Sequence, residues 1–323
     1  MARKHFLIPT RLIERRPEFR NIGWRLEAII VRSLVGLIRT MSPESAGRFA
    51  NFVFRSLSGL FPFTAKIRAN LSVAFPDKDA GEIEQLTRNA CGHLGNAAVD
   101  LALADRLWAE RERRVEFVME EGVDLAGYRG RPLVMITGHF GAWQIAMFVA
   151  RVHELCVTSV YAPEANPYLR EFLLGLRRRL GGEFVSRDGC MRVLTKELRR
   201  GNAVGLAADT RMDSGEPIPF FGVPTPSNTT AARLALRHDC DFLPVRAERL
   251  PGMRYRITVG RPVRPADPTA PMPEQARQMT QQVLERFEDW IRDNPDQWMC
   301  FGRRWPREAY AKDSAAAGAA GEA

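Results

Sequence analysis

The sequence predicts an α/β protein with a mixed, largely parallel sheet flanked by helices and a helical N-terminal region. Two observations lead to this prediction. From about Trp24 to Glu110 the apolar residues recur at helical spacing, whereas from Arg131 short apolar runs alternate with helical segments. Such alternation is typical of a sheet covered by helices on both faces. With 323 residues, 45% of them hydrophobic, the chain can bury a core of that size.

The first 40 residues hold nine lysines and arginines against three glutamates, so the net charge of +9 is concentrated at one end. Residues 26–40 are apolar, but Arg32 interrupts them and they fall short of the ~20 residues of a spanning helix. Arginines precede any hydrophobic run, unlike in a signal peptide. On a helix, one side would carry Ile29, Ile30, Ser33, Leu34 and Leu37.

That side would either lie in an anionic headgroup layer or pack on the protein's own core. We therefore divide the chain into a basic amphipathic membrane-associating segment (1–40), a single domain (41–310) and a low-complexity, disordered tail (311–323). Within the domain, Ser42 has the position of a helix cap and Pro76 that of a helix break.

The strands and helices from residue 131 onward follow from composition and period. Runs predicted as strands are 132–137, 156–162, 183–186, 203–208, 241–249 and 254–260. Segments predicted as helices are 143–153, 166–180, 189–201, 227–238 and 273–293. The five cysteines are scattered without a Cys-x-x-Cys pair, which argues against disulfides and a zinc site and fits a reducing cytoplasm.

His139 lies in "GHFGAWQ" (138–144), directly after the predicted strand 132–137. Ligands of open α/β sheets bind at the carboxyl ends of strands, and Gly138 and Gly141 permit a tight turn there. Because the pKa of histidine is near neutral, His139 could act as a general base. A structural hydrogen-bonding role is the alternative, since no Gly-x-Ser-x-Gly motif accompanies it.

Asp209 ends another predicted strand, and Ser227 to Thr230 open a predicted helix downstream of it. The two strand ends and the helix amides could converge on one crevice, where the amides would stabilise an oxyanion.

Together these segments resemble the late, lipid A-type lysophospholipid acyltransferases of bacteria and the related mycobacterial mannoside acyltransferases. The resemblance is carried, in order, by "KIRANLSVAFP" (66–76), "GHFGAWQ" (138–144), residues 161–189, residues 205–235 and "DQWMCFGRRW" (296–305). It covers roughly three quarters of the chain and does not specify a substrate.

The resemblance implies transfer of a fatty acyl chain from an acyl carrier protein or coenzyme A thioester to a hydroxyl of a lipid A-like glycolipid. It also implies a peripheral or monotopic protein on the cytoplasmic face of the inner membrane, with no metal or bound cofactor. The expected partners are acyl carrier protein, the lipid acceptor and an anionic lipid surface. Nucleic acid is not expected despite a pI near 9.7, because no aromatic-interleaved basic motif is present.

In that family the histidine of a His-x4-Asp/Glu motif is the general base, which His139 matches, but this sequence has Gln144 in place of the acid. The chain is then an inactive or repurposed paralogue, an engineered form, or a protein whose carboxylate comes from elsewhere. We predict the last, with a catalytic dyad of His139 and Asp209. Gln144 would assist it by accepting a hydrogen bond from the ring, although it has no charge to stabilise imidazolium.

Further residues are candidate contacts, and among them Arg187 matches a basic position that the family uses near its active site. Arg187 would hold a phosphate or pantetheine oxygen, or form a surface salt bridge. Phe220 and Phe221 would line an acyl channel, or belong to the core. Ser227, Asn228 and Thr229 would supply oxyanion donors. The arginine runs 177–179 and 303–304 would dock an acidic carrier protein or headgroups, or be solvated faces.

Two other functions stay open at this point. One is a catalytically lapsed paralogue that binds lipid or acyl carrier protein, which Gln144 favours. The other is a thioesterase, with water replacing the acceptor; the basic amphipathic N-terminus argues mildly against it.

Overall fold

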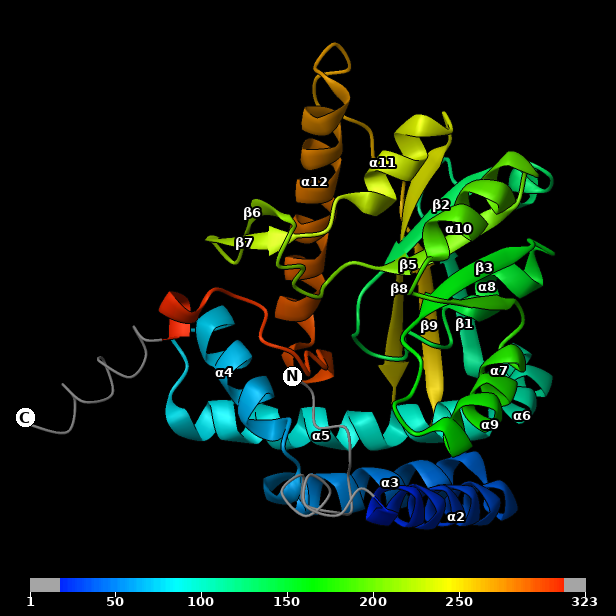
Figure 1. Cartoon of the computed structure of the whole chain (residues 1–323), viewed down its shortest axis with the longest axis vertical. Coiled ribbons are helices and arrows are strands. Elements are labelled where there is room, and N and C mark those ends of the chain that lie inside the picture. The colour runs from blue at the N-terminus through cyan, green and yellow to red at the C-terminus, as the bar shows by residue number, and fades with distance from the viewer. Residues whose placement is uncertain (1–17, 311–323) are drawn as a thin grey trace, which may run out of the picture.

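A computed structural model of the protein describes residues 18–310, which form a seven-stranded sheet flanked by helices (Figure 1). The strand order is β1-β9-β8-β2-β5-β3-β4. The strands are β1 (Val115–Met119), β2 (Leu133–Thr137), β3 (Val157–Tyr161), β4 (Glu183–Ser186), β5 (Ala203–Ala207), β8 (Asp241–Leu250) and β9 (Arg254–Val259). Only the β8–β9 pairing is antiparallel, so the predicted mixed, largely parallel sheet is confirmed.

Helices cover both faces of this sheet. The helices that follow its strands are α8 (Met147–Val152), α9 (Pro167–Arg178), α10 (Cys190–Arg199), α11 (Thr230–Arg237) and α12 (Met272–Asp293). Alternate residues of β2 face different cores: Val134 and Ile136 pack with α10, α11 and α12, whereas Leu133 and Met135 pack with α8 and α9. Burial on both faces explains why these strands read as continuous apolar runs.

Six of the observed strands were expected from the sequence, and three were missed. β1 lies in a stretch without a predicted element. The hairpin of β6 (Glu216–Phe220) and β7 (Val223–Ser227) pairs Pro217 with Pro226 and Pro219 with Pro224. Proline lacks a backbone N–H and therefore argues against a strand, but it is tolerated in this two-stranded ribbon, where both strands are edges.

Two predicted helices are shorter than expected. Residues 141–146 form turns, so the helix predicted over 143–153 is regular only in α8. The helix predicted over 227–238 begins at Thr230, because Ser227 is the last residue of β7.

The N-terminal region is helical up to Arg114, as predicted. It contains α2 (Glu18–Thr40), α3 (Pro43–Ser56), α4 (Thr64–Ala74), α5 (Ala80–Ala102), α6 (Ala104–Ala109) and α7 (Arg111–Arg114). The side chain of Ser42 accepts a hydrogen bond from Ser45 N and caps α3, as expected. A Cβ at Gly95 of α5 would lie 2.5 Å from Ala50 O of α3, so this glycine lets the two helices touch.

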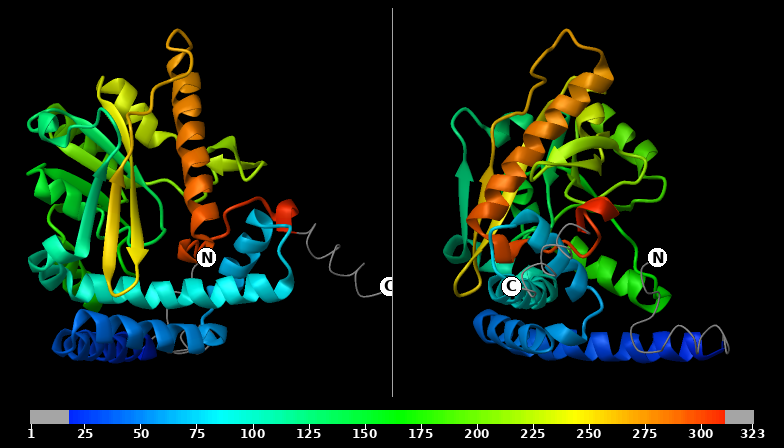
Figure 2. Two further views of the ribbon diagram at one scale, coloured as in Figure 1. Left: turned by 180° about the vertical axis from the view of Figure 1, so that it is seen from behind. Right: turned by 90° about the vertical axis from the view of Figure 1, so that its left-hand side faces the viewer.

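Helices α2 and α3 form a layer beneath α5 (Figures 1 and 2). Helix α2 presents an apolar stripe to solvent, made of Ile22, Leu26, Ile29, Ile30, Leu34 and Leu37. Its opposite side packs on the protein through the buried Ala28 and the half-buried Val35 and Ile38. Within residues 18–310 no helix has both the length and the apolar composition needed to cross a membrane. Residues 1–17 of the predicted membrane-associating segment and the predicted tail 311–323 lie outside the described residues.

A buried ionic cluster ties α5 to the sheet. Asp100 of α5 accepts hydrogen bonds from both Nη atoms of Arg249 and from the hydroxyl of Tyr255. The side chain of Gln297 bonds to the backbone N and O of the same Arg249, at 3.0 Å each. The cluster thereby fixes the C-terminal segment around residue 297 against β8.

Candidate active site

The site is built on the register of two adjacent parallel strands. Thr137, the last residue of β2, lies opposite Ala207, the last residue of β5. The chain continues two residues beyond each strand, to His139 and to Asp209. Their side chains meet, with His139 Nδ1 2.7 Å from Asp209 Oδ1. The contact expected from the two strand ends is therefore present, at the carboxyl edge where ligands of α/β sheets bind.

The loop that carries His139 is held by backbone hydrogen bonds from two sides. Met299 N donates to His139 O and Gly141 N donates to Gln297 O, both at 2.8 Å. Ala142 N donates to Ala247 O of β8, also at 2.8 Å. Gly141 has φ +59°, and a Cβ there would lie 2.1 Å from Ala247 O. Only glycine fits this position, so Gly141 allows the loop that carries His139 to lie directly against β8.

The electrostatics favour a charged or strongly polarised pair. Asp209 is 0% exposed, and burial alone would raise the pKa of its carboxyl group. The charge of His139 and its hydrogen bond have the larger opposite effect, so the pKa of Asp209 is lowered below its usual value. Burial likewise lowers the pKa of His139, and the Asp209 carboxylate more than reverses this, so the histidine pKa is raised. An ionised carboxylate can only accept, so Nδ1–H donates to it. Asp209 thus supplies the negative charge that Gln144 lacks.

Trp298 is a further partner of the aspartate. Its indole Nε1 donates to Asp209 Oδ2 at 3.4 Å, and its ring is 1% exposed within a cluster with Phe220, Phe221 and Trp305. Trp298 lies in the segment "DQWMCFGRRW", whose sequence alone gives it no role. A tryptophan side chain always carries an N–H donor, and this was the one sign in the sequence that Trp298 could bind a carboxylate. No local pattern links Trp298 to Asp209, which lies 89 positions earlier.

The C-terminal segment is anchored by Asn70 of α4. Asn70 Nδ2 donates to Cys300 O and Gly302 O, at 3.0 and 2.7 Å. Its Oδ1 accepts from Tyr310 OH at 2.6 Å and from Arg304 N at 3.2 Å. The "KIRANL" segment therefore positions the residues that cover Asp209.

His139 remains open to a substrate. Since Asp209 occupies Nδ1, the Nε2 atom is the ring nitrogen free to exchange a proton. Nε2 makes no hydrogen bond to the described residues, and the side chain is 29% exposed. The ring of Trp143 lies beside it, with centroids 5.6 Å apart. The arrangement can remove a proton from a group that approaches the carboxyl edge of β2.

Gln144 does not contact the histidine as expected. Its Oε1 is buried and has no hydrogen-bond partner among the described residues, because Nδ1 of His139 is taken by Asp209. Residues 141–146 form turns rather than the expected helix. The structure thus lacks the expected hydrogen bond, while a catalytic contribution of Gln144 stays a prediction.

Two residues proposed to contact substrate lie in the protein interior. Phe220 is 0% exposed and stacks on Trp305, so its position is that of core rather than of a channel wall. Ser227 is also 0% exposed; its hydroxyl donates to Thr225 O and accepts from Arg304 Nη2. In both cases the C-terminal segment covers the residue, which the local sequence does not reveal.

The other proposed contacts stay predictions. Phe221 is half-buried and packs on Phe75 and Trp298. Asn228 Oδ1 accepts from Thr230 N, so the first amide of α11 is already paired, and Thr229 is 6% exposed. Arg187 follows β4 at the same edge of the sheet and is 69% exposed, with Nε 3.7 Å from Asp188 Oδ1.

Cys300, the thiol beside the pair, is not a reactive nucleophile. The neighbouring Cys300 thiol is buried, and burial together with Asp209 raises its pKa to about 12, so it stays protonated. Across residues 18–310 no group of three or more His, Cys, Asp or Glu side chains is arranged to hold a metal ion.

The fold and the pair define an α/β protein whose site lies at the carboxyl edge of the sheet. The chain belongs to the bacterial lipid A biosynthesis acyltransferases, whose family model matches residues 16–307. The protein is therefore an acyltransferase of the lipid A type, as the resemblance implied.

Among solved structures, the chain is similar to the 1-acyl-sn-glycerophosphate (LPA) acyltransferase PlsC from Thermotoga maritima. The identity is 13% and the TM-score 0.37, over 82% of this chain and 97% of that one. The two structures are thus only distantly alike. No curated protein matches the sequence.

Proposed function

We propose that the protein transfers a fatty acyl chain from an acyl carrier protein or coenzyme A thioester to a hydroxyl of a lipid A-like glycolipid, with His139 as general base. One observation carries the proposal: a buried carboxylate, Asp209, bonds Nδ1 of a histidine whose side chain is 29% exposed and whose Nε2 has no hydrogen-bond partner among residues 18–310. This is the arrangement by which a carboxylate orients an imidazole and stabilises the imidazolium.

The proton moves in a balanced cycle. Nε2 of His139 takes the proton of the acceptor hydroxyl while the oxygen attacks the thioester carbonyl, giving a tetrahedral intermediate. Its collapse breaks the C–S bond and forms the ester. The departing thiolate recovers the proton from the imidazolium, which Asp209 has stabilised in the meantime. Asn228, Thr229 and the unpaired amides at the start of α11 are our candidates for oxyanion donors.

The protein is proposed to act as a peripheral protein at the cytoplasmic face of the inner membrane. Support comes from the exposed stripe of α2, because an amphipathic helix that packed only on its own protein would bury such residues. Phe49 and Phe52 of the adjacent α3 are also exposed. Helices α2 and α3 lie in one layer (Figure 2). Their exposed apolar side chains therefore favour insertion into lipid over packing on the protein's own core.

The experiment incubates purified protein with acyl-acyl carrier protein or acyl-coenzyme A and a lipid A precursor, and follows products by mass spectrometry. We expect acylated acceptor, and its loss in His139→Ala. His153→Ala is the matched control, since His153 lies outside the site.

Free fatty acid in place of acylated acceptor would indicate the thioesterase instead. If neither product formed, the result would favour the other alternative, a paralogue without catalytic activity that binds lipid or acyl carrier protein. The glutamine at position 144 is the residue that favours that alternative. In cells, a lipid profile unchanged by deletion of the gene under all conditions would contradict the transferase.

A further inference from the structure

Arg304, in the C-terminal segment that covers Asp209, is a buried cation without a counter-ion. It is 0% exposed and forms no ion pair with any residue of the described range 18–310. Its Nη2 donates to Ser227 Oγ at 3.1 Å, whereas Nε and Nη1 have no hydrogen-bond partner among those residues. An isolated charge in a protein interior is costly, so a buried arginine normally has a carboxylate partner.

The other arginines that are buried within residues 18–310 do have such partners. Arg114 of α7 contacts the carboxylates of Glu44 and Glu110, both at 2.6 Å. Arg249 of β8 pairs with Asp100. The lack of a counter-ion is therefore particular to Arg304 and is not typical of the buried arginines of this protein.

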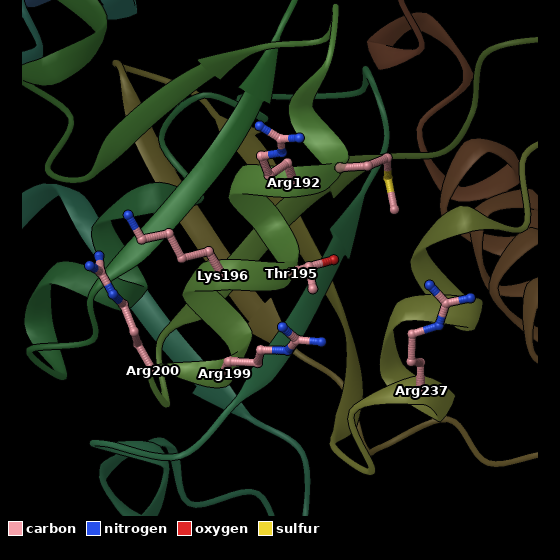
Figure 3. A pocket seen from close by; sticks show the side chains of 7 residues that line it. Arg192, Thr195, Lys196, Arg199, Arg200 and Arg237 are labelled. Atoms are coloured by element: carbon pink, nitrogen blue, oxygen red, sulfur yellow. The ribbon is translucent and has the colours of Figure 1, made fainter.

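Exposed cations give a second comparison. The cations that line the groove between α10 and α11 are all exposed (Figure 3): Arg192, Lys196, Arg199, Arg200 and Arg237. Water stabilises such charges, so they need no counter-ion within the protein. Arg304 has no contact with solvent, and its charge must be balanced inside the molecule.

Arg304 packs on the aromatic cluster that also contacts Asp209. Its Cζ atom lies 4.7 Å from the centroid of the Phe220 ring, and that ring lies 5.9 Å from the ring of Trp298. Trp298 in turn donates a hydrogen bond to Asp209 Oδ2. The guanidinium and the carboxylate therefore border one buried cluster, from which water is excluded.

Of the titratable groups that act most strongly on Arg304, only Asp209 is an anion. Burial raises the pKa of the Cys300 thiol to about 12 and also raises the pKa of the Tyr310 hydroxyl, so both groups are neutral. Arg211 is a second cation. Burial lowers the pKa of Arg304 to about 10, which still leaves the guanidinium charged at neutral pH.

Asp209 requires a positive charge in the state that precedes proton transfer. When His139 is protonated, the imidazolium balances the carboxylate. When His139 is neutral and ready to act as a base, Asp209 without another cation would be an isolated buried anion, and the pair would retain its proton. Burial raises the pKa of Asp209 and His139 lowers it, and Arg304 adds to the lowering.

We propose that Arg304 is a positioning residue that acts through Asp209: its fixed charge keeps the carboxylate ionised while His139 is neutral. This role rests on the proposed function, in which His139 is the general base. It also replaces the docking role suggested for the arginine run 303–304, because Arg304 is too deeply buried to meet a carrier protein or a headgroup. Its neighbour Arg303 is exposed.

The test measures the titration of His139 by NMR in protein with labelled histidine, where loss of one resonance in His139→Ala assigns the signal. Arg304→Gln removes the charge and keeps an N–H donor near Ser227. We expect the midpoint of His139 to rise by about 1 pH unit, because the imidazolium no longer faces a second buried cation. Arg304→Met, which lacks the donor as well, should give the same shift. Thermal unfolding checks the fold of both variants.

Two controls separate the charge from other effects. Arg303→Met makes the same kind of change at the exposed neighbour, where water screens the charge, and His139 should titrate as in the wild type. Ser227→Ala removes the hydrogen bond and keeps the charge of Arg304, so the midpoint should also stay in place.

The pH profile of acyl transfer should follow the titration. In Arg304→Gln we expect kcat/KM to fall ~10-fold on the acid side and to recover at alkaline pH, since only the unprotonated base is active. An arginine that served only to anchor Ser227 would instead reduce the rate equally at every pH.

A midpoint that stays in place or falls in a folded neutral variant of Arg304 would overturn the inference, as would an equal rise in Arg303→Met or Ser227→Ala. The NMR titration needs no substrate and therefore separates the two proposals. A raised midpoint in a protein that transfers no acyl chain would support the action of Arg304 on the pair and contradict the proposed function alone.

Discussion

His139 and Asp209 stand at the same distance along two neighbouring parallel strands, two residues beyond the paired ends Thr137 and Ala207, and their side chains meet at 2.7 Å. A carboxylate two residues beyond β5 thereby bonds the ring nitrogen that an acid five residues after the histidine would otherwise bond. Substitutions at both positions test whether Asp209, rather than residue 144, supports catalysis by His139.

Asp209→Asn should lower kcat for acyl transfer by ~10²- to 10⁴-fold, because an amide neither stabilises imidazolium nor fixes the Nδ1–H tautomer. Gln144→Ala should lower it far less, since Gln144 has no bond to His139. Steady-state rates with acyl-pantetheine measure both, and thermal unfolding checks the fold. Normal rates in Asp209→Asn combined with loss in Gln144→Ala would reverse the assignment.

The pH dependence should report the same pair. A general base must be unprotonated, so kcat/KM falls as pH falls through the pKa of His139, which Asp209 raises above 6.5. In Asp209→Asn the carboxylate is gone and burial remains, so the inflection should move to lower pH. An inflection that stays in place would mean that Asp209 does not set this pKa.

Trp298→Phe should keep the ring packing and remove the N–H that bonds Asp209 Oδ2. A lost hydrogen bond of this kind costs about 0.5–1.5 kcal/mol, so we expect kcat to fall roughly 2- to 10-fold with KM unchanged. Trp305→Phe is the matched control, because its Nε1 bonds Phe220 O instead of the aspartate. If both variants lost the same activity, the effect would come from the aromatic cluster.

Gly141→Ala should both destabilise the protein and abolish transfer, because the new Cβ would meet Ala247 O and displace His139. Gly122→Ala provides the comparison: φ is +81° and no atom lies within 4 Å, so only the backbone cost of about 1–2 kcal/mol applies. Chemical denaturation and activity are measured together. Full activity in Gly141→Ala would show that the loop tolerates another conformation.

Ile30→Asp/Leu34→Asp should weaken binding to vesicles that contain anionic lipid by at least ~10-fold, since each aliphatic side chain buried in lipid contributes about 1.5–3 kcal/mol. Both residues are exposed, so the fold should persist. Val152→Asp/Met272→Asp makes the same change at exposed apolar residues outside α2 and should bind normally. Sedimentation with vesicles distinguishes the two pairs.

The sequence predicted the central strands and the approach of His139 to Asp209, because buried parallel strands read as apolar runs and their carboxyl ends share an edge. It did not predict the hairpin of β6 and β7, whose prolines contradict strand propensity. Nor did it predict the burial of Ser227, and it left Phe220 open between channel and core, because both depend on side chains more than 75 residues later in the chain.

The hydrogen bond expected between His139 and Gln144 is absent because Asp209, which follows another strand, occupies Nδ1 of the ring. The local motif spacing does not show this tertiary partner. The interaction of Trp298 with Asp209 was missed because it is purely tertiary and no periodicity reports it.

The backbone bonds from residues 297–299 to the His139 loop also set an order of events during synthesis. A ribosome releases the histidine and the aspartate long before the segment that fastens their loop and covers the carboxylate. Since chains emerge from the N-terminus, the two side chains become a finished pair only when about nine tenths of the protein has been translated. A nascent chain therefore contains both residues and their strands before it contains the segment that fastens the His139 loop.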